Sequence, residues 1–255
     1  MNSYMRELIV RFGAKALRNL EKIFAWGSTV GNPTFFSSDL FPWVRNLEAA
    51  APKMRSELSA VLQDLDRIPN FQDISADQKH LSDDDDWKTY FFYAFGIRSE
   101  RNCEQCPETA RLIESVPGMQ TAFFSILAPG KHIPDHRGVF KGVIRYHLGL
   151  IVPEPKEACR IRVGNDIRYW EEGKSLIFDD TYRHEVWNDT DGTRVILFMD
   201  VERPLRFPAN VLNGLLIWII RRSPLVKDGV ANYHAWEAKL ERRASAQTRE
   251  LEGAD

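Results

Sequence analysis

Two histidines and an arginine are the residues of this chain best suited to chemistry. His136 and His184 each lie in or beside a short β-prone segment, and Arg194 follows the second histidine by ten residues. An imidazole nitrogen suits iron or zinc as a ligand, whereas a guanidinium fork binds a carboxylate at two points. Together the three side chains could hold a metal ion with an organic acid bound to it.

His184 and Arg194 are predicted to face each other on neighbouring strands. The turn-forming residues 188–192 separate the β-prone segment 184–187 from the segment 194–201. This spacing favours two antiparallel strands joined by a tight turn. The alternative is that His184 and Arg194 are ordinary polar residues on a half-exposed hairpin.

Another candidate strand, residues 143–153, carries a cation and an imidazole. The two-residue period of a strand places Arg145, His147 and Gly149 on one face. The other face then holds Tyr146, Leu148 and Leu150. Because the flanking sequence is apolar, we expect this strand to be buried. A buried cation beside a buried imidazole needs an anion or a hydrogen-bond partner, so the pattern predicts an anionic ligand here.

The order of turn signals predicts a mainly β fold with flanking helices. Residues 31–115 are expected to mix helix and loop, with one helix at 43–65. From 119 to 201 short strands follow in quick succession between Pro- and Gly-containing turns. This rhythm is typical of a double-stranded β-helix, or cupin-like jelly roll. We therefore predict a jelly-roll core at 119–201 within a single catalytic domain at 31–207.

Several ordered motifs lie between residues 85 and 207. They are Ser125, Pro129-Gly130, His136, Arg145-Tyr146-His147-Leu148-Gly149-Leu150, Trp170-Glu171-Glu172-Gly173-Lys174, Phe178-Asp179-Asp180, His184-Glu185-Val186-Trp187 and Arg194. This pattern resembles the aspartyl/asparaginyl β-hydroxylase family of Fe(II)/2-oxoglutarate dioxygenases. Through Trp87-Lys88, Cys106-Pro107 and Asp200-Val201-Glu202-Arg203-Pro204 it is most similar to the bacterial branch that includes the lipid A acyl-chain 2-hydroxylases.

The resemblance implies Fe(II) as the cofactor, with 2-oxoglutarate and O2 as cosubstrates. His136 and His184 would be the iron ligands, and Arg194 would bind the far carboxylate of 2-oxoglutarate. The implied activity is hydroxylation of an unactivated C–H bond. The substrate would be either a lipid-borne acyl chain or a peptidyl Asp or Asn side chain.

Three further residues are assigned to the cosubstrate pocket by the same resemblance. Ser125 and His147 would line the pocket, and Arg145 would lie nearer its boundary with the substrate. Asp135, Asp179 and Asp180 are interpreted as structural, or as groups that fix the orientation of an imidazole.

Gly138 departs from the pattern of most iron dioxygenases, which carry Asp or Glu two residues after the first histidine. The β-hydroxylase family lacks that carboxylate, so Gly138 agrees with the resemblance and would leave a coordination position for water. A similar gap lets some halogenating relatives bind chloride. A halogenase is therefore one alternative, and a non-catalytic cupin-like sensor of a metal and a small acid is another.

Charge and cysteine content limit the partners and the compartment. A net charge of −2 over 255 residues argues against a protein that binds nucleic acid by neutralising phosphates. The cysteine number, 3, is odd, and no signal peptide is evident, so a cytoplasmic location is expected. Cys103 and Cys106 form a lone CxxC motif that is interpreted as incidental.

Both ends of the chain are predicted to be helical. Residues 1–30 place apolar side chains, among them Met5, Leu8, Ile9, Phe12 and Phe24, at helical spacing between basic ones. The C-terminal segment 208–255 contains the apolar run 211–220, which is shorter than the about 20 residues that span a bilayer. Either these segments pack on the barrel, or residues 1–27 and 211–220 dock together as a peripheral contact on a membrane surface.

Overall fold

The computed structural model describes residues 3–75 and 79–252. The strands are β1 (Phe35–Phe36), β2 (Trp87–Ala94), β3 (Ile97–Arg98), β4 (Met119–Leu127), β5 (His132–His136), β6 (Val143–Ile151), β7 (Cys159–Val163), β8 (Asp166–Tyr169), β9 (Ser175–Phe178), β10 (His184–Asn188) and β11 (Arg194–Glu202). The helices are α1 (Ser3–Gly27), α2 (Val44–Val61), α3 (Phe71–Ile74), α4 (Glu100–Gln105), α5 (Pro107–Glu114), α6 (Ala209–Arg221) and α7 (Pro224–Glu252). Short 3-10 helices span 38–40, 62–67 and 156–158.

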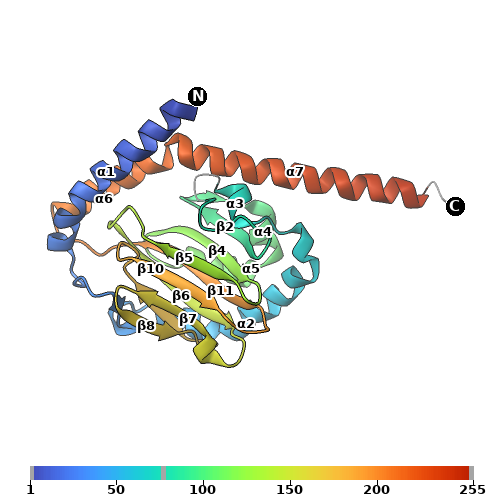
Figure 1. The fold of residues 1–255 in the computed structure, drawn as a ribbon, viewed down its shortest axis with the longest axis horizontal. Coiled ribbons are helices and arrows are strands. Elements are labelled where there is room, and N and C mark those ends of the chain that lie inside the picture. The colour runs from blue at the N-terminus through green and yellow to red at the C-terminus, as the bar shows by residue number, and fades with distance from the viewer. Residues whose placement is uncertain (1–2, 76–78, 253–255) are drawn as a thin grey trace.

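Two antiparallel sheets form the body of the protein, with helices along one side and at one end (Figure 1). Within the described residues the larger sheet has seven strands, in the order β1-β9-β6-β11-β4-β2-β3. The smaller sheet has four, in the order β5-β10-β7-β8. The fold is thus mainly β with flanking helices, and its core is the predicted jelly roll.

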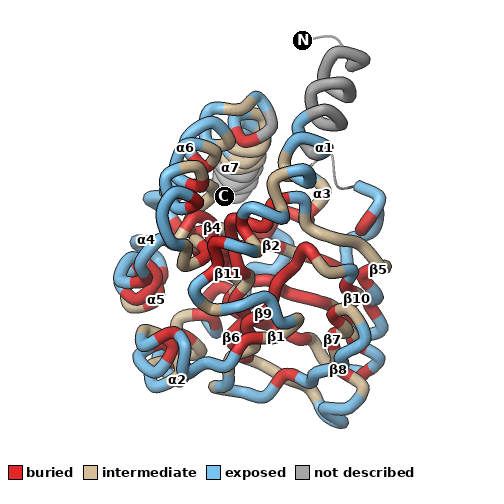
Figure 2. Tube along the Cα trace, turned by 90° about the vertical axis from the view of Figure 1, so that its left-hand side faces the viewer, coloured by how far each residue is buried: buried red, intermediate tan, exposed pale blue. Residues whose placement is uncertain are grey.

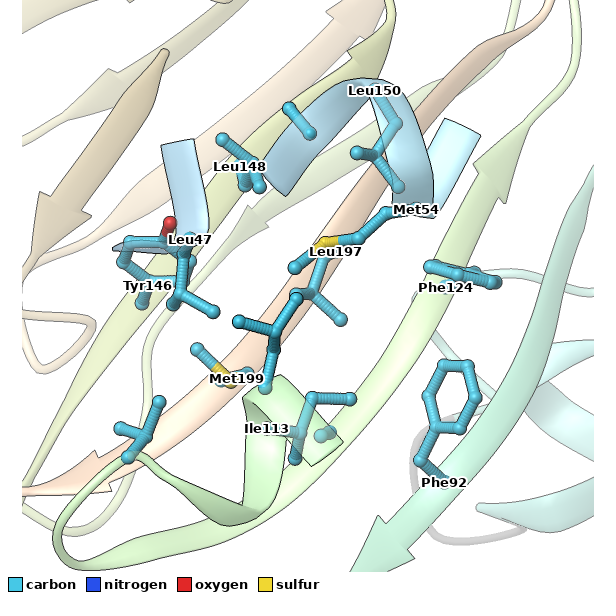
Figure 3. Packing of buried hydrophobic residues seen from close by; sticks show 14 of the residues in the cluster. Leu47, Met54, Phe92, Ile113, Phe124, Tyr146, Leu148, Leu150, Leu197 and Met199 are labelled. Carbon is cyan, nitrogen blue, oxygen red and sulfur yellow. The ribbon is translucent and has the colours of Figure 1, made fainter. Parts of the chain in front are cut away.

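The central strands of the larger sheet are buried on both faces, and the two faces have different partners. On the outer face Tyr146, Leu148 and Leu197 belong to an apolar cluster with side chains of α2 and α5, shown in Figure 3. Burying such a side chain fully contributes about 1.5–3 kcal/mol, so this cluster fixes the helices on the sheet. The division of β6 into two faces, predicted from its period, is confirmed by this packing.

The inner face of the larger sheet meets the smaller sheet. Side chains from both sheets form one apolar cluster there, and its buried members include Leu127, Ile133, Ile161, Phe178 and Ile196. Charged and polar residues alternate with the outer cluster along β6 and β11, so they too point into this interior. The period of the strands therefore puts Arg145, His147 and Arg194 inside the barrel.

β10 and β11 do not form the hairpin predicted from the sequence. β10 pairs with β5 and β7 in the smaller sheet, whereas β11 pairs with β4 and β6 in the larger one. The turn between them crosses from one sheet to the other, and the Asn188 amide holds it by donating to the carbonyl oxygens of Leu127, Ala128 and Gly192. A turn signal in the sequence is local and does not specify which sheet the next strand joins. His184 and Arg194 are consequently on opposite sheets.

The interpretation of residues 31–115 as helix and loop missed β2. This strand pairs with β4 throughout its length and extends the larger sheet beyond the predicted core. Tyr90 and Phe92 lie in the outer cluster, while Phe91 packs on Phe123 from the other side. Because both faces of β2 are covered, its sequence lacks the alternation that marks a half-buried strand.

Helices α1 and α6 contact each other at one end of the barrel. Phe24 of α1 and Ile217 of α6 share a buried cluster with Phe140 and Val143. Figure 2 shows that buried residues concentrate in the strands, whereas α1 and α6 keep much exposed surface. The side chains before Gly13, including the predicted apolar positions Met5, Leu8, Ile9 and Phe12, lie outside the described part of the chain. Among the helices that are described, none is both long and apolar enough to cross a membrane.

Candidate metal and cosubstrate site

His136 and His184 lie side by side on the paired strands β5 and β10. They are register partners, and their ring centroids are 4.1 Å apart. The Nδ1 atom of His136 lies 2.7 Å from the carbonyl oxygen of Pro134, and that of His184 lies 3.0 Å from the carbonyl oxygen of Tyr182. Because a carbonyl oxygen only accepts, each Nδ1 carries the proton and each Nε2 keeps its lone pair. This is the tautomer that metal-binding histidines adopt.

Burial keeps both imidazoles neutral. It lowers the pKa of His136 to about 4, and the nearby Arg145 adds to that effect. It also lowers the pKa of His184 well below its usual value, with further contributions from His136 and Arg145. A neutral imidazole binds a metal without first losing a proton, so the pair fits an iron ion.

In the part of the chain that the structure describes, no third protein ligand accompanies the two histidines. Within residues 3–75 and 79–252, no group of three or more His, Cys, Asp or Glu side chains could hold a metal ion. Gly138 has no side chain, and a Cβ atom at this position would overlap the carboxylate of Asp180. The space that Gly138 was predicted to leave for water is therefore bordered by a carboxylate from another loop.

Asp180 is held beside Gly138 by Arg145. Its Oδ2 lies 2.9 Å from an Arg145 nitrogen, while its Oδ1 is buried without a hydrogen-bond partner among the described residues. Burial raises the pKa of Asp180 to about 6, although Arg145 opposes the rise. The unpaired Oδ1 leaves this carboxylate able to accept a hydrogen bond from a ligand or a water molecule.

Arg194 is a buried cation that has no anion beside it in the described structure. It begins β11, is 2% exposed, and has its guanidinium carbon 4.7 Å from the ring centroid of Trp170. Its Nε and Nη1 atoms have no hydrogen-bond partner in the part of the chain described. Burial lowers the pKa of Arg194 to about 10. Such a group is costly unless an anion joins it, so its position fits the far carboxylate of a bound acid.

His147 connects Arg194 to the histidine pair. Its ring stacks near Trp170, with centroids 6.0 Å apart, and meets Phe178 edge-on at 4.9 Å. Phe178 in turn lies 5.7 Å from His184. Both ring nitrogens of His147 lack a partner in the described chain, and burial lowers its pKa well below the usual value, with Arg194 contributing. The interior thus brings the predicted iron ligands, His147 and Arg194 into one chain of contacts.

Ser125 and Arg145 are inside the barrel as well, but both already have partners. Ser125 is 3% exposed, and its Oγ accepts a hydrogen bond of 3.0 Å from the indole of Trp87. Arg145 pairs with Asp180 at 2.9 Å and with Asp200 at 3.1 Å. Arg145 is therefore neutralised by protein carboxylates, whereas Arg194 is not. This difference favours Arg194 as the residue that binds an added carboxylate.

Three residues of the site received no pocket role from the sequence. Trp170 and Phe178 belong to quoted motifs, but only the structure places their rings between His184 and Arg194. Asp180 was interpreted as structural or supporting, and its position beside Gly138 depends on a contact between segments 42 positions apart in the sequence. The glycine itself was the available signal, because it leaves room for another side chain.

The family model of aspartyl/asparaginyl β-hydroxylase matches residues 48–204, and the chain belongs to this family of hydroxylases. The ornithine lipid ester-linked acyl 2-hydroxylase of Rhizobium tropici is 46% identical over 231 residues, which cover 88% of this chain and 82% of that protein. The human aspartyl/asparaginyl β-hydroxylase is 39% identical over 133 residues, which cover 50% of this chain and 17% of that protein.

Solved structures that are similar to this chain include cupin domains. The cupin domain of Schizosaccharomyces pombe Cnp3 aligns with 50% of this chain and 71% of its own length, at 11% identity and a TM-score of 0.33.

Proposed function

We propose that this protein is an Fe(II)/2-oxoglutarate-dependent hydroxylase. The observation that carries the proposal is a buried, unpaired arginine, Arg194, in the same interior as two neutral histidines, His136 and His184. The histidines would hold the iron, and Arg194 would bind the far carboxylate of 2-oxoglutarate. When bound, iron with 2-oxoglutarate and O2 supplies the oxidising power to insert one oxygen atom into a C–H bond, with release of succinate and carbon dioxide.

The side chains of the site would position the reactants and exclude water. The backbone carbonyls of Pro134 and Tyr182 fix both imidazole rings through Nδ1. The buried rings of Trp170 and Phe178 lie between the histidine pair and Arg194, so the guanidinium would act in a medium of low dielectric constant. In such a medium its attraction for a carboxylate is strong and directional.

We propose an acyl chain carried by a lipid as the substrate. The similarity to the acyl 2-hydroxylase extends over 88% of this chain, far beyond the barrel, whereas the similarity to the human β-hydroxylase covers 50%. Hydroxylation of a peptidyl Asp or Asn is the second candidate, and the family match favours it. The two candidate functions differ in the substrate and share the same iron chemistry.

Asp180 disfavours the halogenase alternative. A halide at the position left by Gly138 would lie against a carboxylate, and two anions in a buried space repel each other. The non-catalytic sensor differs from both hydroxylases in a simpler way, because it would bind iron and the acid without forming succinate.

A turnover assay tests the proposal. Anaerobically iron-loaded protein is given 2-oxoglutarate, oxygen, and either a bacterial lipid extract in detergent or Asp- and Asn-containing peptides. Succinate is measured, and products are examined by mass spectrometry for a gain of one oxygen atom. We expect succinate and a lipid product. Oxygenated peptides alone would support the second candidate, and iron and 2-oxoglutarate binding without succinate would support the sensor.

A further inference from the structure

An apolar surface is exposed where α1 and α6 lie together at the end of the barrel (Figure 1). We call it the α1/α6 surface. It consists of apolar side chains that are between 39% and 76% exposed: Ile23, Trp26, Phe207, Val211, Leu215, Trp218 and Ile219. Exposed apolar side chains that gather on two adjoining helices indicate a site of interaction with a partner or a membrane.

Helix α6 carries apolar side chains on its outer side as well as on the side that packs on the barrel. Asn213 and Ile217 face the barrel and are buried. Val211, Leu215 and Trp218 recur at the spacing of helical turns on the other side and are 61%, 55% and 53% exposed. An apolar helix face is normally buried, so the outer side of α6 lacks an apolar cover among the described side chains.

Arginines border this surface and stack on its tryptophans. The Arg206 guanidinium lies 5.3 Å from the ring centroid of Trp26, and that of Arg222 lies 4.0 Å from the ring centroid of Trp218. Residues 203–223 contain no Asp or Glu. Tryptophan and arginine together are typical of the boundary between acyl chains and headgroups, and the excess of cations complements an anionic lipid.

The same charges argue against a second copy of the chain as the occupant. A two-fold interface places each surface against itself. Arg206 and Arg222, together with exposed Lys22 of α1, would then face the like charges of the partner. Like charges placed opposite each other in an interface oppose association, whereas an anionic bilayer attracts all of them.

The α1/α6 surface is joined to the iron site through the loop that follows His136. Arg137 pairs with Glu21 of α1 at 2.5 Å, and Phe140 meets Phe24 edge-on at 5.6 Å. Asn213 of α6 donates a 3.0 Å hydrogen bond to the carbonyl oxygen of Gly142. Both helices therefore hold the segment that carries an iron ligand, and a bilayer bound to them would lie beside the site.

We propose that the α1/α6 surface docks on an anionic lipid bilayer and so presents the barrel to acyl chains within it. This inference rests on the lipid substrate of the proposed function. Val211, Leu215 and Trp218 would lie among the acyl chains near the headgroups. Arg206 and Arg222 would lie at the level of the phosphates.

Sedimentation with vesicles tests the docking surface directly. We expect the full chain to bind phosphatidylglycerol-containing vesicles more tightly than phosphatidylcholine vesicles, and less tightly as salt rises. The double variant Val211→Glu/Leu215→Glu should lower the affinity at least about tenfold, because it puts charge among acyl chains. Arg222→Gln should lower it about fivefold, equivalent to about 1 kcal/mol. Ile167→Glu is the matched control, since Ile167 lies on β8 and is 43% exposed, and it should bind as the wild type does.

Three results would overturn the docking inference. The first is equal vesicle binding by the wild type and the Val211→Glu/Leu215→Glu variant. The second is no vesicle binding by the wild type, when its cooperative unfolding shows that the protein is folded. The third is a lipid-free dimer of the wild type that this variant converts to a monomer, which would assign the surface to a second copy.

Activity on detergent-dispersed lipid separates this inference from the proposed function. The variant should retain that activity, whereas its absence from the wild type, with normal vesicle binding, would contradict the proposed function alone.

Discussion

Two buried arginines flank strand β11, and their surroundings differ. Arg203 follows the strand and donates hydrogen bonds to an Asp179 oxygen at 2.6 Å and to the carbonyl oxygen of Lys141 at 2.7 Å. The Lys141 ammonium joins the same carboxylate at 2.5 Å. Arg194 begins the strand and lies over Trp170, with two of its nitrogens unpaired within the described chain. Both cations are 2% exposed.

Under the proposed function, this difference separates a structural charge from a charge that would bind a ligand. Desolvation penalises both guanidinium groups, and Arg203 regains that free energy from partners inside the protein. Arg194 has no such partner among the described residues, so in the proposed function a bound carboxylate would supply the compensation. The end of β11 with the unpaired arginine therefore supports the proposed function, whereas the paired cluster at the other end joins Arg203, Lys141 and Asp179.

The largest expected effect comes from the histidines beside the unpaired arginine. His136→Ala and His184→Ala should each abolish turnover and iron retention, since no third protein ligand in the described chain could replace the lost one. Iron content after dialysis and succinate formation measure the effect. His234→Ala, on α7 and paired with Glu237, serves as the control and should keep both. Tight iron binding in either site variant would place the metal elsewhere.

Removal of Arg203 tests whether the paired arginine stabilises the fold. Arg203→Met should lower the free energy of unfolding by about 3–5 kcal/mol, because it leaves Asp179 buried with only Lys141 as its cationic partner. Chemical denaturation measures the change. An unfolding free energy equal to that of the wild type would show that this cluster does not stabilise the barrel.

A substitution at Gly138 tests whether the Asp180 carboxylate already occupies the space beside this glycine. Gly138→Asp should impair turnover and lower the free energy of unfolding by about 1–3 kcal/mol, since its Cβ would overlap the Asp180 carboxylate. Gly214→Ala is the control, because a Cβ there meets nothing within 4 Å and should stabilise helix α6 by about 0.5–1 kcal/mol. Faster turnover in Gly138→Asp would show that a carboxylate ligand at this position is tolerated.

The smallest expected change in stability belongs to the unpaired arginine. Arg194→Met keeps much of the side-chain volume and removes a buried charge that has no anionic partner among the described residues. We expect its free energy of unfolding to stay within about 1 kcal/mol of the wild type or to rise. Thermal and chemical unfolding of the metal-free protein measure it. A loss of unfolding free energy as large as that of Arg203→Met would mean that both arginines stabilise the fold to the same extent.

Periodicity in the sequence was enough to predict the barrel and the direction of its charged side chains. The alternation in β6 put Arg145 and His147 on one face because a strand has a fixed two-residue repeat, and the structure confirms it. Strand β2 was missed, since a strand covered on both sides loses that alternation. The crossing between β10 and β11 was predicted wrongly as a hairpin, since a turn motif carries no information about long-range pairing.

The site could be predicted in its residue types but not in its pairings. The sequence alone does not show whether Arg145 or Arg194 has an acidic partner. Only the packing shows that Asp180 and Asp200 neutralise Arg145. Asp180 reaches the space beside Gly138 across a long sequence separation. Which charges remain unpaired is a property of the folded chain, and this property distinguishes Arg194.

Binding of 2-oxoglutarate to the anaerobic, iron-loaded protein is the most direct test of the central claim. Isothermal titration calorimetry should show one molecule bound per chain of the wild type. Arg194→Ala should weaken this binding by a factor of about 30 or more, the equivalent of at least about 2 kcal/mol, with iron affinity little changed. Arg194→Lys should recover only part of the loss, since an ammonium lacks the two-point fork. Equal 2-oxoglutarate affinity in the wild type and Arg194→Ala would contradict the account, because the unpaired cation would then not be the anchor of the cosubstrate.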